Sequence, residues 1–174
     1  AVLRQNRHDV EIYHQDVYHY PESHLTAYLD KERFDVIGVG ACAGYWQYQK
    51  INTLVEAVRQ SDTCPNIILG GHMVSGAPEY FRDKLKTAIF VGEGERSLIG
   101  YLQGFIGIPS IIKSEPIEQI DAIPMPALEL FPIDYYSLIR LPRAEKWDRC
   151  FPVLSGRGCP FHCNFCFRLE EGYR

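Results

Sequence analysis

The sequence predicts an α/β fold with a doubly wound parallel sheet, and two observations support this. Short runs rich in β-branched residues recur along the chain, and each is followed by a stretch with helical periodicity. Regular alternation of strand and helix is typical of a parallel sheet with helices on its faces. Small residues also cluster after three of the runs, where such a sheet leaves room for a ligand. The predicted strands are Val10–Tyr13, Val36–Val39, Ile67–Leu69 and Ala88–Val91.

The clearest predicted helix lies between the second and third strands. Apolar residues recur there every three or four positions, which is the spacing of one buried helix face. These residues are Tyr48, Ile51, Leu54, Val55 and Val58. Further helices are predicted at the opening AVLRQN, at Ser23–Lys31, at Pro78–Lys84 and at Ser97–Leu102.

Three regions are expected along the chain. Residues 1–107 form the α/β unit, and because the opening helix has no strand ahead of it, we expect the first strand to be missing from this sequence. Residues 108–150 contain six prolines, which break any long helix or strand. The segment also contains apolar side chains, so it is expected to form a packed connector. Residues 151–174 are expected to open a second, truncated domain, with a strand at Val153–Ser155.

Composition limits the classes of function. The formal net charge is −4 and the Lys and Arg residues are scattered, which argues against a nucleic-acid partner. No run approaches the roughly 20 apolar residues of a membrane span, and no hydrophobic leader opens the sequence. We therefore expect a soluble, cytoplasmic protein without a membrane partner. In that reducing compartment the six cysteines are expected to be thiols or metal ligands rather than disulfides.

Three loops of small residues follow predicted strands at one edge of the sheet, where a large, flat ligand can approach the backbone. The alternative is that the glycines only make tight turns, that Glu93 caps a helix, and that His72 is simply hydrogen-bonded. Tyr45, Trp46 and Tyr48 either cover a planar ligand or belong to the core. Neither the dinucleotide fingerprint nor the P-loop pattern is present. The candidate contacts are Ala41, Cys42, Ala43, Gly44, Gly70, Gly71, His72, Gly92, Glu93 and Gly94.

Three cysteines, Cys159, Cys163 and Cys166, stand at the spacing C-x3-C-x2-C near the end of the chain. Three thiolates so close together can converge on one soft centre, either zinc or an iron–sulfur cluster. Structural zinc normally has four ligands, so it would need Cys150 or His162 as well. A redox pair at Cys163 and Cys166 is a further alternative that leaves Cys159 idle. The remaining interpretation is a cubane cluster with one iron left open for a substrate or cofactor.

The cysteine pattern, with the aromatic Phe165 before its last cysteine, resembles the signature of the radical S-adenosylmethionine (radical SAM) superfamily. Upstream segments resemble, in the same order, the subgroup in which a cobalamin-binding domain precedes the radical domain. The resemblance covers Asp35 to Cys166. The segments are DVIGVGACAG, NIILGGHMVSGAPEYF, FVGEGERSLIGYL and IDAIPMPALELFPIDYY.

This resemblance implies a flavodoxin-like (Rossmann-like) cobalamin-binding domain, a connector, and the first strand and cluster loop of a radical SAM partial TIM barrel. It also implies that Cys159, Cys163 and Cys166 hold a 4Fe-4S cluster whose open iron chelates S-adenosylmethionine. Phe165 would lie near the adenine, and the ten loop residues named above would contact cobalamin. The D-x-H-x-x-G motif that supplies an axial histidine in some cobalamin domains is not present.

By the same resemblance, the intact enzyme would generate a 5'-deoxyadenosyl radical and use it with cobalamin. The expected reaction is methyl transfer to an unactivated carbon or a radical cyclisation of a small-molecule substrate, with flavodoxin or ferredoxin as electron donor. These 174 residues alone are expected to be inactive. The alternative function is a non-catalytic module that binds a corrinoid or another flat ligand and ends in a structural zinc knuckle.

Overall fold

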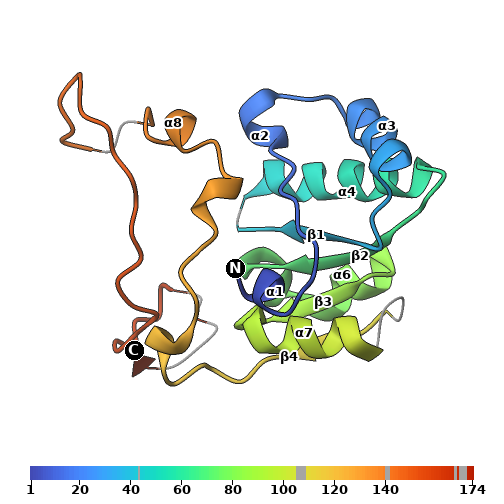
Figure 1. The fold of residues 1–174 in the computed structure, drawn as a ribbon. Coiled ribbons are helices and arrows are strands. Elements are labelled where there is room, and N and C mark those ends of the chain that lie inside the picture. Colours follow the sequence, from blue (N-terminus) through green and yellow to red (C-terminus); the bar gives the residue numbers. More distant parts are fainter. Residues whose placement is uncertain (43, 105–108, 140–141, 167, 169–171) are drawn as a thin grey trace.

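The chain folds around a parallel β-sheet (Figure 1). The structure, a computed structural model, describes residues 1–174 except 43, 105–108, 140–141, 167 and 169–171. Within these ranges the sheet has four parallel strands in the order β1-β2-β3-β4. They are β1 (Val36–Gly40), β2 (Asn66–Gly70), β3 (Ala88–Val91) and β4 (Ile111–Lys113). The predicted α/β class and three of the predicted strands are confirmed.

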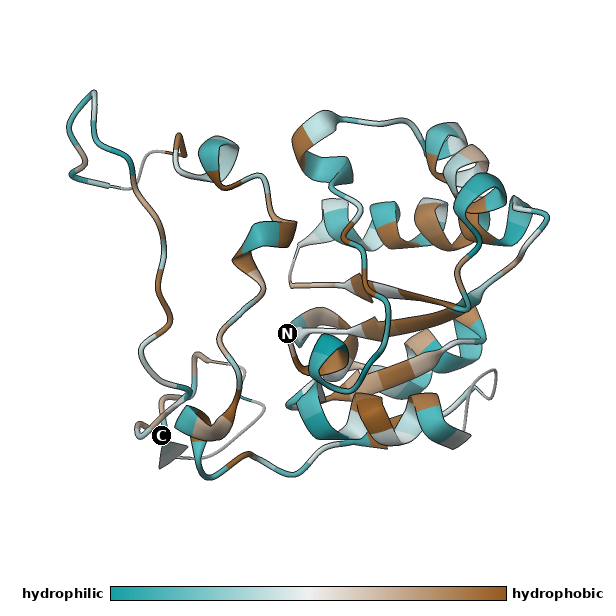
Figure 2. Ribbon diagram, viewed as in Figure 1, coloured by the Kyte–Doolittle hydropathy of each residue, from teal (hydrophilic) through white to brown (hydrophobic). Residues whose placement is uncertain are grey.

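Helices cover both faces of the sheet. On one face, Val55 and Val58 of α4 and Leu29 of α3 pack against Leu69 and Ile89 of the strands. On the other face, Tyr101 of α7 packs against the sheet. Figure 2 shows the apolar residues concentrated in the strands and on the helix sides that face them. The helices of the first face are α3 (Glu22–Glu32), α4 (Tyr45–Gln60), α5 (His72–Gly76) and α6 (Pro78–Leu85), and α7 (Gly94–Gly104) covers the second together with α1 (Val2–Gln5).

Two predicted strands are wrong. Val10–Tyr13 lies in no β-ladder, because side chains rather than a backbone partner hold it: the Tyr13 hydroxyl lies 2.7 Å from His24 Nδ1. Val153–Ser155 also lies in no ladder, and its apolar side chains are exposed. The strand near it instead forms at β5 (Gly158–Cys159), which pairs antiparallel with β6 (Gly172–Tyr173).

The proline-rich segment after the sheet lies along the α/β unit. Its first described residues supply β4, which the sequence analysis missed, and Ile117 is buried. Farther along, His14 Nε2 lies 2.8 Å from the Leu130 carbonyl, and Arg4 pairs with Glu129. The short elements of the first half of the chain and of this segment are α2 (Gln15–Tyr18), η1 (Ile120–Ala122), η2 (Leu128–Leu130) and α8 (Ile133–Tyr136). None of the helices in the described residues is long and apolar enough to cross a membrane.

Candidate cobalamin edge and cysteine hairpin

The three loops predicted to contact a ligand lie together at the carboxyl edge of the sheet. Since β1, β2 and β3 are parallel neighbours, the residues that follow Gly40, Gly70 and Val91 meet at one edge. Ala43 lies outside the described residues. The other predicted contacts divide into residues that build the edge, exposed residues that a ligand can reach, and the residues of the third loop.

Ala41 and Gly71 build the edge. Ala41 is buried, its N–H donates to the Gly70 carbonyl at 2.8 Å, and its carbonyl accepts from Met73 N–H at 3.2 Å. A Cβ on Gly71 would lie 2.2 Å from the Ala41 carbonyl oxygen, and Gly71 has a φ of +108°. Glycine is therefore required at position 71 so that the first two loops can touch.

Exposed residues of the same edge form its accessible surface. Cys42, Gly44 and His72 are exposed, and no atom lies within 4 Å of the position that a Cβ on Gly44 would occupy. Trp46, in the first turn of α4, is 81% exposed, and Tyr45 beside it is exposed as well. These residues offer a flat ligand an open glycine, an imidazole and two aromatic rings.

Tyr48 belongs to the helix packing instead. Its ring contacts Tyr80 and Phe81, and its hydroxyl lies 2.6 Å from that of Tyr80. Of the three aromatic candidates, only Tyr45 and Trp46 remain at the accessible edge.

The third loop holds a buried acidic side chain. The Glu93 side chain is only 7% exposed, and its carboxylate accepts from Ile117 N–H at 2.6 Å. It also pairs with Arg157 and Arg174, and Arg157 makes a second ion pair with Glu95 at 2.6 Å. The Glu93 carboxylate therefore holds another segment of the chain, and the contact of this residue with a ligand stays a prediction. Gly92 has a φ of +88°, with Ser114 O 3.0 Å from the position of a Cβ, and Gly94 has open space around it.

The pKa of Glu93 reflects this arrangement. Burial by itself raises the pKa of the carboxyl, but the Ile117 N–H and the two guanidiniums lower it by more, so it lies below its ordinary value. Glu93 is therefore ionised at neutral pH and can hold both arginines.

The segment that Glu93 holds is the base of the cysteine hairpin, defined here as Arg157–Arg174. Arg157 and Arg174 exchange two backbone hydrogen bonds of 2.9 Å, directly beside the β5–β6 pair. Gly158 has a φ of +82°, and a Cβ there would lie 2.2 Å from the Gly172 carbonyl oxygen. Cys159 follows immediately, so the first thiol of the predicted trio lies two residues from the arginine that pairs with Glu93 and Glu95.

The cysteines themselves are free thiols. Cys159 is half-buried, and Cys163 and Cys166 are exposed. In the part of the chain that the structure describes, no three His, Cys, Asp or Glu side chains are grouped to hold a metal ion. The donor set fits a soft metal or an iron–sulfur cluster by its chemistry, since three unpaired thiols stand within eight residues. Phe165, beside the last cysteine, is 97% exposed.

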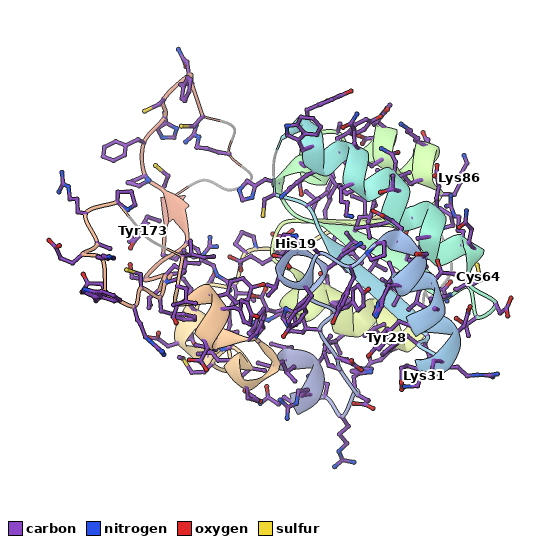
Figure 3. All side chains as sticks on the ribbon, turned by 90° about the horizontal axis from the view of Figure 1, so that it is seen from above. His19, Tyr28, Lys31, Cys64, Lys86 and Tyr173 are labelled. Atoms are coloured by element: carbon purple, nitrogen blue, oxygen red, sulfur yellow. The ribbon has the colours of Figure 1, made fainter. Side chains whose placement is uncertain are left out.

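Of the other cysteines, Cys150 is half-buried and its N–H donates to the Ser137 carbonyl at 3.1 Å. Cys64 lies at the opposite end of the molecule from Tyr173 of the hairpin (Figure 3). Cys64 therefore cannot contribute to a site at the hairpin in this arrangement.

Sequence reasoning missed Arg157 and Arg174. They stand 62 and 81 residues from their partners Glu95 and Glu93, so no local pattern marks them. The sequence shows the acidic pair Glu93 and Glu95, but its partners follow only from the fold.

A model of the B12-binding domain family matches residues 1–101, more than half of the chain. The chain belongs to the B12-binding domain family. The matched residues include α1 and strands β1 to β3 with their three loops, which is the part that builds the candidate edge. Membership of this family supports cobalamin as the ligand of that edge.

A second comparison reaches beyond the B12-binding domain. The chain is 26% identical over 187 aligned residues to an uncharacterized methyltransferase of Pyrococcus horikoshii. The match covers 95% of this chain and 38% of that protein, so the chain spans about two fifths of the length of the relative. No solved structure matches the chain.

Proposed function

We propose that this chain is the cobalamin-binding part, together with the start of the cluster-binding part, of a radical SAM methyltransferase. Family membership supports the cobalamin part. The name of the relative supports methyl transfer over cyclisation. The observation that carries the proposal is the contact of Glu93 with Arg157 and Arg174, which holds the base of the cysteine hairpin against the edge where cobalamin is expected.

The residues of the chain have separate tasks in this proposal. Gly44 and His72 would leave the edge open to the corrin ring, and Tyr45 and Trp46 would flank it. Cys159, Cys163 and Cys166 would hold the 4Fe-4S cluster, and Phe165 would lie beside S-adenosylmethionine. When bound, the cluster supplies the electron that cleaves S-adenosylmethionine, and cobalamin supplies a methyl carrier. The protein contributes the placement of one site next to the other.

Two partners follow from this proposal. A small-molecule substrate receives the methyl group, and an electron donor such as flavodoxin or ferredoxin reduces the cluster. The exposed Cys163 and Cys166 segment is the surface on which we expect the rest of the radical domain to pack.

Replacing Cys159 by alanine tests the proposal against the zinc-knuckle alternative. After anaerobic reconstitution with iron and sulfide, the unchanged chain is expected to hold about four irons, the cubane stoichiometry. The Cys159→Ala chain is expected to lose most of this iron, because a ligand is missing. Both are expected to shift the absorption spectrum of added cobalamin equally, because Cys159 is not part of the cobalamin edge.

The matched control is Cys64→Ala, at an exposed cysteine far from the hairpin. It is expected to keep both the iron and the spectral shift. Equal iron in the two variants, or loss of the cobalamin shift in Cys159→Ala, would contradict the assignment of two separate sites.

A further inference from the structure

A lysine and two tyrosines form a polar cluster on the surface of α4 and α6. Lys84 and Tyr80 stand four residues apart on α6, so they share one face of that helix. Tyr48 of α4 lies beside them, with its ring stacked on that of Tyr80 at a centroid distance of 6.4 Å. None of the three belongs to the candidate cobalamin edge or to the cysteine hairpin. We call these three residues the phenol–lysine cluster.

The polar atoms of the cluster converge on the hydroxyl oxygen of Tyr48. Lys84 Nζ donates to this oxygen, and the Tyr80 hydroxyl lies 2.6 Å from it. Lys84 Nζ also lies 3.3 Å from the Tyr80 hydroxyl and 4.7 Å from the centre of the Tyr48 ring. An oxygen that accepts from an ammonium group and has a second hydroxyl beside it is well placed to carry a negative charge.

These contacts favour the phenolate form of Tyr48. The hydrogen bond from Lys84, followed by the one with Tyr80, holds the pKa of Tyr48 below its ordinary value of 10.0. The hydrogen bonds to the same two phenols raise the pKa of Lys84, so its ammonium group keeps its charge when Tyr48 loses its proton. At neutral pH a larger fraction of Tyr48 is therefore ionised than of an ordinary tyrosine.

Packing holds the Tyr48 ring while its oxygen stays at the surface. The ring contacts that of Phe81, a buried residue of the core, at a centroid distance of 6.1 Å. Tyr80 is 49% exposed and Lys84 is exposed, and the hydrogen bonds that join them to Tyr48 are exposed as well. A small reagent can therefore reach the Tyr48 oxygen without a change of fold.

We propose that the phenol–lysine cluster is a modification site, at which Tyr48 is the nucleophile and the substrate is an activated acyl donor. Tyr48 first loses its phenolic proton to solvent. Its oxygen then attacks the acyl carbon, so that a C–O ester bond forms. The bond from that carbon to the leaving group breaks, and the leaving group departs with the electron pair and takes a proton from water. Lys84 stays charged throughout and stabilises the attacking phenolate.

The lowered pKa of Tyr48 has two opposing effects on its reactivity. A less basic phenolate is a weaker nucleophile, whereas a larger ionised fraction raises the rate. For thiols below their pKa, the loss on a logarithmic scale is only about half of the gain, and the same balance is expected for a phenol. Tyr48 is therefore expected to react faster than an exposed tyrosine that has no cationic neighbour.

Limited acetylation of the 174-residue chain tests this proposal. The chain is treated at neutral pH with a substoichiometric amount of N-acetylimidazole, and the acetylated peptides are quantified by mass spectrometry. The internal control is Tyr45 of the same helix, which is 67% exposed and accepts a hydrogen bond of 3.1 Å from the neutral amide of Gln49. We expect Tyr48 to react faster than Tyr45 by about fivefold or more, because its donor is charged.

Two variants separate the charge of Lys84 from its packing. Lys84→Met removes the charge and keeps an unbranched side chain, so it is expected to lower the rate at Tyr48 to that at Tyr45. Lys84→Arg retains a charged donor and is expected to keep most of the difference. Because Lys84 is exposed, both variants are expected to fold.

The pattern of acetylation decides the proposal. Preferential acetylation of Tyr48 that disappears in Lys84→Met and persists in Lys84→Arg supports it. Equal rates at Tyr48 and Tyr45 contradict it, and so does a preference that survives Lys84→Met or is lost in Lys84→Arg. Acetylation of Lys84 in place of Tyr48 also contradicts it, because the amine would then be the nucleophile. None of these readouts depends on cobalamin or iron, so they are independent of the proposed function.

Discussion

Replacing Gly71 by alanine is expected to lower the free energy of unfolding by about 3 kcal/mol or more. An added Cβ would lie 2.2 Å from the carbonyl oxygen of Ala41 and 2.8 Å from its carbonyl carbon. Those are backbone atoms of the buried residue Ala41, so they cannot move aside as a flexible side chain would. The φ of +108° adds conformational strain. Urea denaturation of the 174-residue chain measures the change.

Two glycines of the same edge serve as controls. Gly44→Ala carries a similar φ, +104°, but has open space around the added Cβ, so we expect only the strain cost of about 1–2 kcal/mol. Gly94→Ala has neither a positive φ nor a close neighbour and is expected to change stability by less than about 0.5 kcal/mol. If Gly71→Ala is no worse than Gly44→Ala, the close approach of the first two loops is not a real constraint.

Replacing Glu93 by glutamine is expected to release the cysteine hairpin from the sheet edge. The buried carboxylate holds Arg157 and Arg174, and a neutral amide removes the charge of Glu93 from both contacts, while Arg157 keeps its ion pair with Glu95. We expect a loss of about 1–2 kcal/mol, reduced from the value for a fully buried pair because both arginines are partly exposed. Hydrogen exchange at Arg157 and Arg174 is expected to accelerate, since these amides bond to each other's carbonyls.

Acidification provides a second measurement of the same contact. Because the folded pKa of Glu93 lies below its ordinary value of 4.5, its contribution is present above about pH 4.5 and is lost as the pH falls through the folded pKa. The protection of the hairpin amides, taken as the exchange rate relative to that of an unstructured chain at the same pH, is therefore expected to fall in that acidic range in the unchanged chain, and not in Glu93→Gln. The exposed Glu56→Gln on α4 should behave like the unchanged chain. Unaltered hairpin exchange in Glu93→Gln would show that Glu93 does not hold the hairpin.

The sequence predicted the structure best where a periodic pattern of apolar residues coincides with burial. The periodicity of Ile51, Val55 and Val58 predicted one face of α4, and all three are buried. The small residues after β1, β2 and β3 predicted a ligand edge, since parallel strands bring their carboxyl ends together whatever the intervening sequence.

Failures occurred where the structure depends on a partner that the local sequence does not show. Val10–Tyr13 has the composition of a strand, but strand formation needs a backbone neighbour, and within the described residues no strand pairs with this segment. The ion pairs of Glu93 could not be predicted because its arginine partners are more than 60 residues away. Only the fold could show that this carboxylate joins the candidate cobalamin edge to the cysteine hairpin.

The most direct test of the central proposal is the cofactor content of the protein purified natively without exposure to oxygen. Iron, acid-labile sulfide, zinc and corrinoid are measured per chain, the metals by elemental analysis and the corrinoid by its absorption spectrum. We expect about four irons and about four sulfides per chain, together with bound corrinoid. About one zinc with no sulfide would contradict it, because the cysteine trio would then be a closed structural site rather than the start of a radical domain.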